Sequence, residues 1–298
     1  MRRRAALLAC AAILAAGGGA NGAPKPAAAA GSGVFDYDRA APLALRDRGV
    51  LNTGWPKVHD ISFASPKGGR VTAYLVVPRG KGPHPAVIWM HGSGGDRREL
   101  LVPAAWLSAR GAVGLAIDAP EARRPAPRMP RGPAILEKTR DLTVQNVVDL
   151  RRAVDVLLAR ADVDPARIAF AGYSSGARVG AILAGVDHRI GAFDLLSAGA
   201  TPVSAYLKVA PPKLRARLRR DLSVVDPLRY VRLAAPSRLF FQDGRRDRIV
   251  PHAALVALAR AASRPKEVRW YPADHGLNGQ ALRDQRAWLT RVLGLRPS

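Results

Sequence analysis

The stretch RIAFAGYSSGARVGAILA, residues 167–184, decides the fold. The run RIAFA is typical of a short buried strand, and an apolar helix is expected over 175–184. Between them, Gly172, Ser174 and Gly176 fit the pattern G-x-S-x-G. A sharp turn from strand to helix needs the flanking glycines, because a Cβ would clash there. The turn places the Ser174 hydroxyl at a helix N-terminus, where backbone dipoles favour negative charge, and this favours a nucleophile over an idle turn serine.

Strand and helix patterns alternate on both sides of this stretch. Strands are expected over 60–64, 70–77, 86–90, 112–117, 190–196, 238–242 and 267–271, and helices over 99–110, 141–160, 252–262 and 279–293. Such alternation predicts an α/β fold, with a mainly parallel sheet and helices on both faces. Residues 200–236 interrupt the alternation and are expected to form a small helical cap insertion.

A glycine-rich segment, His91-Gly92-Ser93-Gly94-Gly95, follows the expected strand 86–90. Acyl transfer needs two backbone N–H donors aimed at the oxyanion of the tetrahedral intermediate. We expect one donor from Ser175 and the other from Ser93, with Gly94 as the next choice. A role for His91 as catalytic base competes with this interpretation. A phosphate loop is excluded, because no Lys-Ser/Thr pair follows a G-x-x-x-x-G spacing.

A serine nucleophile needs a base and an orienting acid. Among six histidines, His275 lies between the last expected strand and the last helix, where a loop at the carboxyl edge of the sheet reaches Ser174. Asp247, just before the Ile-Val-Pro that starts a helix, fits the acid best. Asp243 is the second choice and is interpreted as a turn residue. The chain order Ser174, Asp247, His275 is the order of α/β-hydrolases rather than of chymotrypsin or subtilisin.

With these motifs in place, the chain resembles the α/β-hydrolase superfamily over residues 59–298, and within it the dienelactone-hydrolase-like and prolyl-oligopeptidase-like secreted serine esterases. The resemblance rests on HGSGG at 91, Asp164-Pro165 leading into GYSSG at 172, and Asp274-His275-Gly276. It implies an α/β-hydrolase fold and serine chemistry. Dienelactone hydrolases use a Cys nucleophile, so their substrate does not carry over. The large propeller domain of oligopeptidases is absent from this chain.

The N-terminus has the three-part pattern of a secretory signal peptide. Arg2, Arg3 and Arg4 precede the apolar run AALLACAAILAA, and small residues follow. We expect a signal peptide over 1–23, a linker and extension over 24–58, and a secreted or periplasmic enzyme, with the export route left open. Cys10 is the only cysteine, so cleavage leaves no disulfide and no catalytic thiol. Lipidation at Cys10 is not expected, because only a short apolar segment precedes it.

Charge alone would suggest an anionic partner, since 47 Lys and Arg against 23 Asp and Glu give +24, or +21 after the signal peptide. Most of this charge is arginine scattered along the chain. Two local clusters are interpreted as solvated basic faces without a specific nucleic-acid role: Arg123, Arg124, Arg128 and Arg131; and Lys208, Lys213, Arg215, Arg217, Arg219 and Arg220. Aspartate pairs at 36/38 and 162/164 lack a third ligand, so neither metal nor cofactor is expected.

These patterns lead to one function and two alternatives. The leading hypothesis is a secreted serine hydrolase that cleaves a carboxylic ester through an acyl-enzyme on Ser174. A serine peptidase of the same fold is the second candidate. The third is a non-catalytic binder of anionic envelope polymers that uses the basic cap. The substrate is expected to be a small-molecule or polymer-linked ester, with possible electrostatic contact to an anionic envelope and no transmembrane segment in the mature chain.

Overall fold

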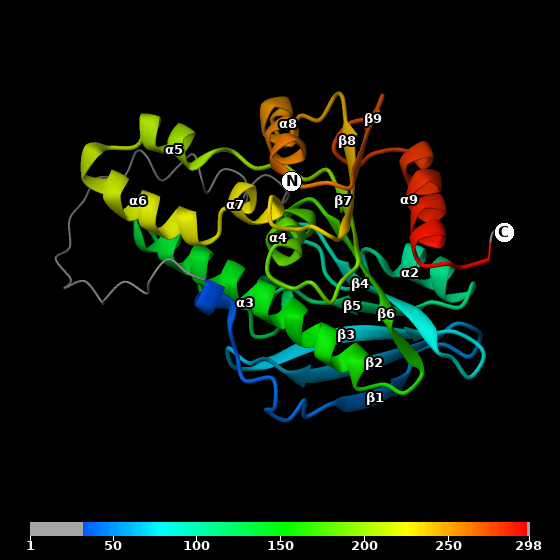
Figure 1. The fold of residues 1–298 in the computed structure, drawn as a ribbon. Coiled ribbons are helices and arrows are strands. Elements are labelled where there is room, and N and C mark those ends of the chain that lie inside the picture. The colour runs from blue at the N-terminus through cyan, green and yellow to red at the C-terminus, as the bar shows by residue number, and fades with distance from the viewer. Residues whose placement is uncertain (1–31, 297–298) are drawn as a thin grey trace.

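A nine-stranded sheet forms the centre of the computed structural model, which describes residues 32–296 (Figure 1). Its strands, in sheet order, are β1 (Arg46–Val50), β2 (Lys57–Ala64), β3 (Arg70–Val77), β5 (Val113–Ile117), β4 (His84–Met90), β6 (Val163–Tyr173), β7 (Ala192–Leu196), β8 (Arg238–Gly244) and β9 (Lys266–Tyr271). The pairs β1–β2, β2–β3 and β3–β5 are antiparallel, and the other pairs are parallel. The mainly parallel α/β fold expected from the sequence is therefore confirmed.

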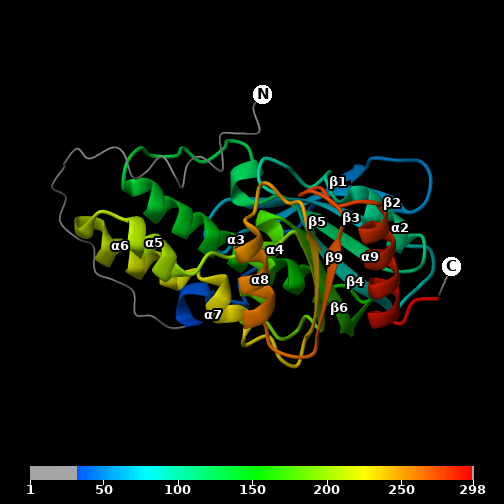
Figure 2. The same ribbon diagram turned by 90° about the horizontal axis from the view of Figure 1, so that it is seen from above.

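Helices cover both faces of this sheet (Figures 1 and 2). One face carries α3 (Ala134–Leu158), α4 (Ser175–Ala184) and α8 (His252–Ala261), and the other carries α2 (Leu101–Ser108) and α9 (Gly279–Val292). The described residues also contain two short 3₁₀ helices, η2 (Ser32–Phe35) and η3 (Pro120–Ala122). The parallel strands are buried on both sides, which explains why their sequences are continuous apolar runs rather than alternating ones.

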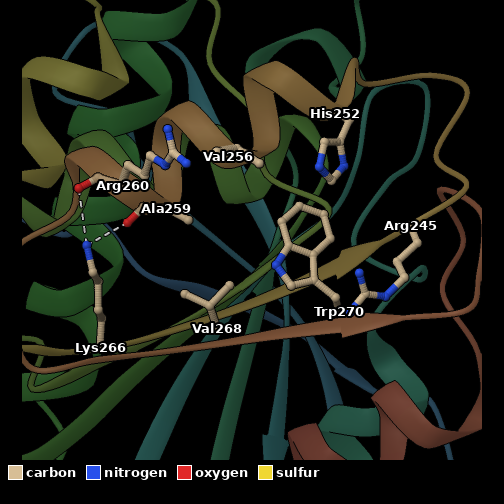
Figure 3. A pocket seen from close by; sticks show the side chains of 8 residues that line it. All are labelled: Arg245, His252, Val256, Ala259, Arg260, Lys266, Val268 and Trp270. Carbon is tan, nitrogen blue, oxygen red and sulfur yellow. Dashed lines mark hydrogen bonds between the residues drawn. The ribbon is translucent and has the colours of Figure 1, made fainter.

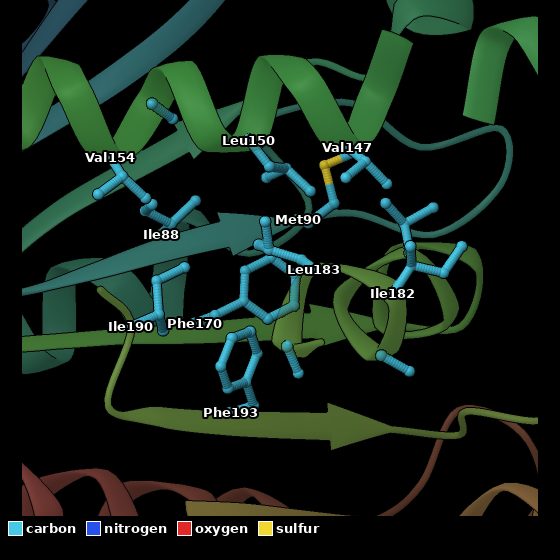
Figure 4. Close-up of a cluster of buried hydrophobic side chains, with 14 of the residues drawn as sticks. Ile88, Met90, Val147, Leu150, Val154, Phe170, Ile182, Leu183, Ile190 and Phe193 are labelled. Carbon is cyan, nitrogen blue, oxygen red and sulfur yellow. The ribbon is translucent and has the colours of Figure 1, made fainter. Parts of the chain in front are cut away.

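The larger hydrophobic core lies between the sheet and the helices α3 and α4 (Figure 4). Phe170 of β6 and Phe193 of β7 are fully buried there, with ring centroids 5.7 Å apart. A Cβ on Gly180 of α4 would lie 2.2 Å from the Phe170 ring. Glycine therefore lets α4 approach the sheet directly behind the Ser174 turn, which fixes the helix that follows the nucleophile position.

Residues 200–236 contain three helices, α5 (Val203–Val209), α6 (Pro212–Val224) and α7 (Pro227–Val231). Helix α6 contacts α3 and α7 contacts α4, and in Figure 1 α5 and α6 extend to the side of the sheet. Before the expected boundary at 59, β1 already pairs with β2, and Phe35 is fully buried in the core. The division into domains stays a prediction, and the expected signal peptide at 1–23 lies outside the described residues.

Most members of the two basic clusters are exposed, but Arg123 is buried, so the expectation of a solvated face is wrong for that residue. Arg123 is only 9% exposed because its guanidinium pairs with the buried carboxylate of Asp149 at 2.7 Å. In α6, Asp221 is 1% exposed and lies 3.3 Å from Arg220 and 2.8 Å from Arg140 of α3. A buried carboxylate requires such partners. The clusters thus help to hold α3 in place, and part of their charge is neutralised.

Candidate active site

Ser174 occupies the turn between β6 and α4, with a φ of 54° that side-chain-bearing residues rarely adopt. A Cβ on Gly172 would lie 2.8 Å from the Ala177 nitrogen, and one on Gly176 would lie 2.5 Å from the carbonyl oxygens of Met90 and His91. Both glycines are therefore required by space, as the sequence predicts. The backbone strain at Ser174 is of the kind that concentrates at functional sites.

Three side chains form a hydrogen-bonded chain at the carboxyl edge of the sheet. His275 Nε2 lies 2.9 Å from Ser174 Oγ, and His275 Nδ1 lies 2.7 Å from Asp247 Oδ2. Because a carboxylate only accepts, Nδ1 carries the proton and Nε2 is left to accept the proton of the serine hydroxyl. The structure thus brings together the three residues that the sequence predicts, from three separate loops.

Asp247 is oriented from both sides. Its Oδ1 accepts the backbone N–H groups of Ile249 and Val250 at 2.8 and 2.9 Å, while Oδ2 faces His275. Its side chain is 1% exposed. Both oxygens are therefore engaged, and the carboxylate is fixed in the position that holds one tautomer and orientation of His275.

His275 is also held through its backbone. Its carbonyl oxygen accepts the Ser197 hydroxyl at 2.8 Å and the Tyr173 hydroxyl at 3.2 Å. The Tyr173 ring packs against the imidazole, with centroids 5.2 Å apart. These contacts fasten the loop between β9 and α9 to the ends of β6 and β7, so the distance between His275 and Ser174 is set by rigid parts of the fold.

The glycine-rich loop after β4 is clamped at Gly92. Its N–H donates to Glu99 Oε2 at 2.6 Å, and its carbonyl accepts from His91 Nδ1 at 2.7 Å. His91 Nε2 accepts the Ala119 N–H at 2.9 Å, and His91 is buried. Both ring nitrogens are thus occupied by backbone groups, so His91 is a structural residue and the alternative of His91 as base is wrong.

The clamp leaves the next residues of the loop as candidates for binding an oxyanion. The Gly92 N–H is already used, whereas the N–H groups of Ser93 and Gly94 make no hydrogen bond within the described residues. Gly92 itself packs against Tyr173 and Ser174, where a Cβ would meet ring and side-chain atoms at 2.9 and 3.4 Å. The loop is thus next to the serine, but the roles of Ser93, Gly94 and Ser175 as donors stay predictions.

Asp243, the second choice for the acid, lies inside β8 and is fully buried rather than in a turn. The Ala198 backbone N–H lies near its carboxyl, yet neither oxygen has a partner at hydrogen-bond geometry. Burial, and then the neighbouring charge of Asp247, raises the pKa of Asp243 to about 7. Of the two aspartates, only Asp247 contacts the histidine.

A cavity of about 820 Å³ adjoins His275. Its walls come from the β6 end, the segment after β8 and the loop between β9 and α9: Tyr173, Arg246, Arg248, Ile249, Pro272, Ala273, Asp274, His275, Gly276, Leu277 and Asn278. None of these residues belongs to the cap at 200–236. A second cavity, of about 380 Å³, lies between α8 and β9 and includes Arg245 and Trp270 but no residue of the hydrogen-bonded chain (Figure 3).

Sequence reasoning missed two contributors to this site. Glu99 precedes α2 and resembles an ordinary acidic residue near a helix start, and Ser197 follows β7 without a motif. The feature that marks Ser197 as unusual is its backbone φ of 51°, which is visible in the structure but not in the sequence. Among the described residues, no group of three or more His, Cys, Asp or Glu side chains could hold a metal ion. No helix in that same part of the chain is long and apolar enough to cross a membrane.

Several solved structures share the fold of this chain. Two acetyl xylan esterases, from Paenibacillus sp. R4 and Thermoanaerobacterium sp. JW/SL YS485, superpose with a TM-score of 0.71 each, at 22% and 15% identity. Each match covers 87% of this chain, and 90% and 91% of the other. A putative dienelactone hydrolase from Klebsiella pneumoniae matches with a TM-score of 0.59 at 17% identity, over 78% of this chain and 97% of the other.

These likenesses confirm the α/β-hydrolase fold. A search of curated proteins finds no match. The family model of the acetyl xylan esterases, AXE1, matches residues 44–195, just over half of the chain, and this region includes the Ser174 turn and the glycine-rich loop. The chain therefore belongs to the acetyl xylan esterase (AXE1) family and is a carboxylic ester hydrolase.

Proposed function

We propose that this protein is a secreted serine esterase that removes small acyl groups, acetyl first among them, from carbohydrate esters through an acyl-enzyme on Ser174. The observation that carries the proposal is the hydrogen-bonded chain from Ser174 through His275 to Asp247, at 2.9 and 2.7 Å. The acetyl group and the carbohydrate follow from the family name and from the titles of the two acetyl xylan esterases.

The reaction follows from the positions of these atoms. His275 Nε2 removes the Ser174 proton as Oγ attacks the ester carbonyl, and the imidazolium that forms is stabilised by Asp247. The negative oxygen of the tetrahedral intermediate is received by the N–H groups of Ser93 or Gly94 and of Ser175. The imidazolium then gives its proton to the leaving alcohol. Water enters and gives a proton to His275 as its oxygen attacks the acyl-enzyme. The bond between the acyl carbon and Ser174 Oγ then breaks, His275 returns the proton to Oγ, and the acid is released.

The test is hydrolysis of p-nitrophenyl esters of increasing acyl length, and release of acetate from acetylated xylan, by wild type and by Ser174→Ala. We expect acetate esters to be cleaved fastest and Ser174→Ala to lose nearly all activity. Thr201, outside the cavity wall, offers a matched control as Thr201→Ala. Absence of turnover on every ester in the series by a folded wild-type protein would overturn the proposal.

Secretion is part of the proposal and rests on the sequence of residues 1–23, with the charged start and apolar run of a signal peptide. Expression of the full chain, followed by mass spectrometry of the exported form, tests it, with cleavage expected after Ala20 or Ala23.

Contact of the basic surface with an anionic envelope stays a prediction. The match to an esterase family disfavours the non-catalytic alternative, whereas Asp221 offsets only part of the charge of the basic cap. Peptide substrates in the same assay test the peptidase alternative.

A further inference from the structure

The loop that carries Asp247 also carries three arginines. Arg245, Arg246 and Arg248 surround the acid in the segment GRRDRIV, and all three are exposed. Arg246 and Arg248 line the cavity beside His275, whereas Arg245 lines the separate cavity between α8 and β9 (Figure 3). Positive charge is therefore placed at the wall of the cavity beside His275 by the same segment that supplies Asp247.

The charge at this wall is only partly offset from within, because two arginines face one carboxylate, that of Asp274. Asp247 is 1% exposed, and its two oxygens are used by backbone N–H groups and by His275. Asp274 is the one acidic residue that lines the cavity, and its Oδ1 accepts the Gly276 N–H. Arg248 makes no ion pair and no hydrogen bond among the described residues. Its guanidinium is therefore available for an anion.

Arg246 is held in place. Its guanidinium donates to the Pro272 carbonyl at 2.5 Å, across the cavity wall. A guanidinium has five N–H donors, so one such bond positions the group and leaves others free. The wall also includes the apolar side chains of Ile249, Leu277 and Pro272. A volume of about 820 Å³ far exceeds what an acetyl group fills, so the cavity has room for the alcohol portion of an ester.

We propose that this cavity is an anion-recognising subsite in which Arg248, with Arg246 beside it, selects esters whose alcohol portion carries a carboxylate on the same ring as the acetylated oxygen. An acidic sugar unit of a polysaccharide has this chemistry: a ring that packs on Ile249 and Leu277, and a carboxylate that pairs with a guanidinium. The inference rests on the proposed esterase function and names its substrate class.

The experiment compares two acetate esters that differ in one group, 4-acetoxybenzoate, which carries a carboxylate, and 4-acetoxybenzamide, which is neutral and of nearly the same shape. The anionic-to-neutral ratio of kcat/KM is measured for wild type, Arg248→Gln and Arg245→Gln. Taking the ratio across variants cancels the intrinsic reactivity of the two esters. We expect Arg248→Gln to lower the ratio about five-fold, the upper end for an exposed ion pair.

Arg245→Gln is the matched control, because it removes the same charge from the same loop but faces the other cavity. The ratio in this variant should stay within about two-fold of wild type, because Arg245 lines the other cavity and salt screens its exposed charge. An unchanged ratio in Arg248→Gln, or an equal fall in both variants, would overturn the subsite. If neither ester is cleaved, the p-nitrophenyl ester series decides the esterase proposal separately. Binding of 4-hydroxybenzoate against 4-hydroxybenzamide to Ser174→Ala, measured by NMR, then still tests the subsite, with tighter binding of the carboxylate expected.

Discussion

The contact between Glu99 and Gly92 gives the most informative prediction about the oxyanion loop. Replacing Glu99 with Ala removes the acceptor that lies 2.6 Å from the Gly92 N–H. Gly92 is buried against Tyr173 and Ser174, so its N–H is left without the partner that fixes the loop. We expect the loop to shift, so that the backbone N–H groups of Ser93 and Gly94 no longer point at the position of the oxyanion.

The size of the effect follows from the geometry. Complete loss of one oxyanion donor costs about 10²–10³ in kcat. Glu99 is exposed and water can take its place at the N–H, so a partial loss of about 10-fold, or about 1.4 kcal/mol, is expected. The loss should lie in kcat rather than in KM, because the oxyanion is absent from the bound ester and forms only in the tetrahedral intermediate and its transition states.

The assay is p-nitrophenyl acetate hydrolysis by wild type, Glu99→Ala and Glu99→Gln, with thermal unfolding of each variant as a check of folding. Glu99→Gln keeps an acceptor for Gly92 and should recover most of kcat. Glu121, an exposed acid near η3, serves as the control Glu121→Ala. A folded Glu99→Ala variant with wild-type kcat would refute the reasoning, as would a Glu99→Gln variant that is no better than Glu99→Ala.

Three further predictions concern buried aspartates. Asp247→Asn should lower kcat for p-nitrophenyl acetate by roughly 10⁴, as this change does in the chymotrypsin triad, and a loss below ten-fold would contradict the triad. Burial raises the pKa of Asp194 to about 7. The unfolded chain therefore loses this proton first, and the stability of wild type falls as the pH rises from about 4 to 7. Asp194→Asn should remove that loss and be more stable than wild type at pH 8, by at most about 4 kcal/mol, and by less at pH 5. Calorimetry measures the difference in stability at both pH values, and an equal difference at both would refute the raised pKa of Asp194. Asp149→Ala strands the buried Arg123 and should cost about 3–5 kcal/mol in urea unfolding, against less than about 1 kcal/mol for Asp96→Ala in an exposed pair.

Elements with a strong local pattern could be predicted from the sequence. Helix α4 begins and ends where the sequence predicts, because Gly172 and Gly176 fix the turn before it. Helix α3 starts at Ala134, before the predicted residue 141, since its buried residues begin only at Thr143. The first turns of α3 contact α6 instead of the core, so their sequence does not show apolar residues at helical spacing. Strand β1 was not predicted for a similar reason, as all five of its residues are exposed.

In the candidate site, too, only the residues with a strong local sequence pattern could be predicted. Ser174, Asp247 and His275 could be proposed because each follows a recognisable strand at the carboxyl edge of a parallel sheet. The clamp on Gly92 could not, since Glu99 and His91 act through contacts that exist only after folding. The basic clusters misled for the same reason, because the partner of Arg123, Asp149, lies on another element. Charge along a sequence does not reveal which carboxylate it will meet in space.

Labelling with a fluorophosphonate probe, followed by intact-mass measurement and peptide mapping, tests the central claim most directly. The account predicts one probe molecule per chain, attached to the peptide that contains Ser174, with labelling abolished in Ser174→Ala and strongly slowed in His275→Gln. Hydrolysis of acetate esters by a protein whose Ser174 is unlabelled, or a Ser174→Ala variant that retains wild-type turnover, would contradict it.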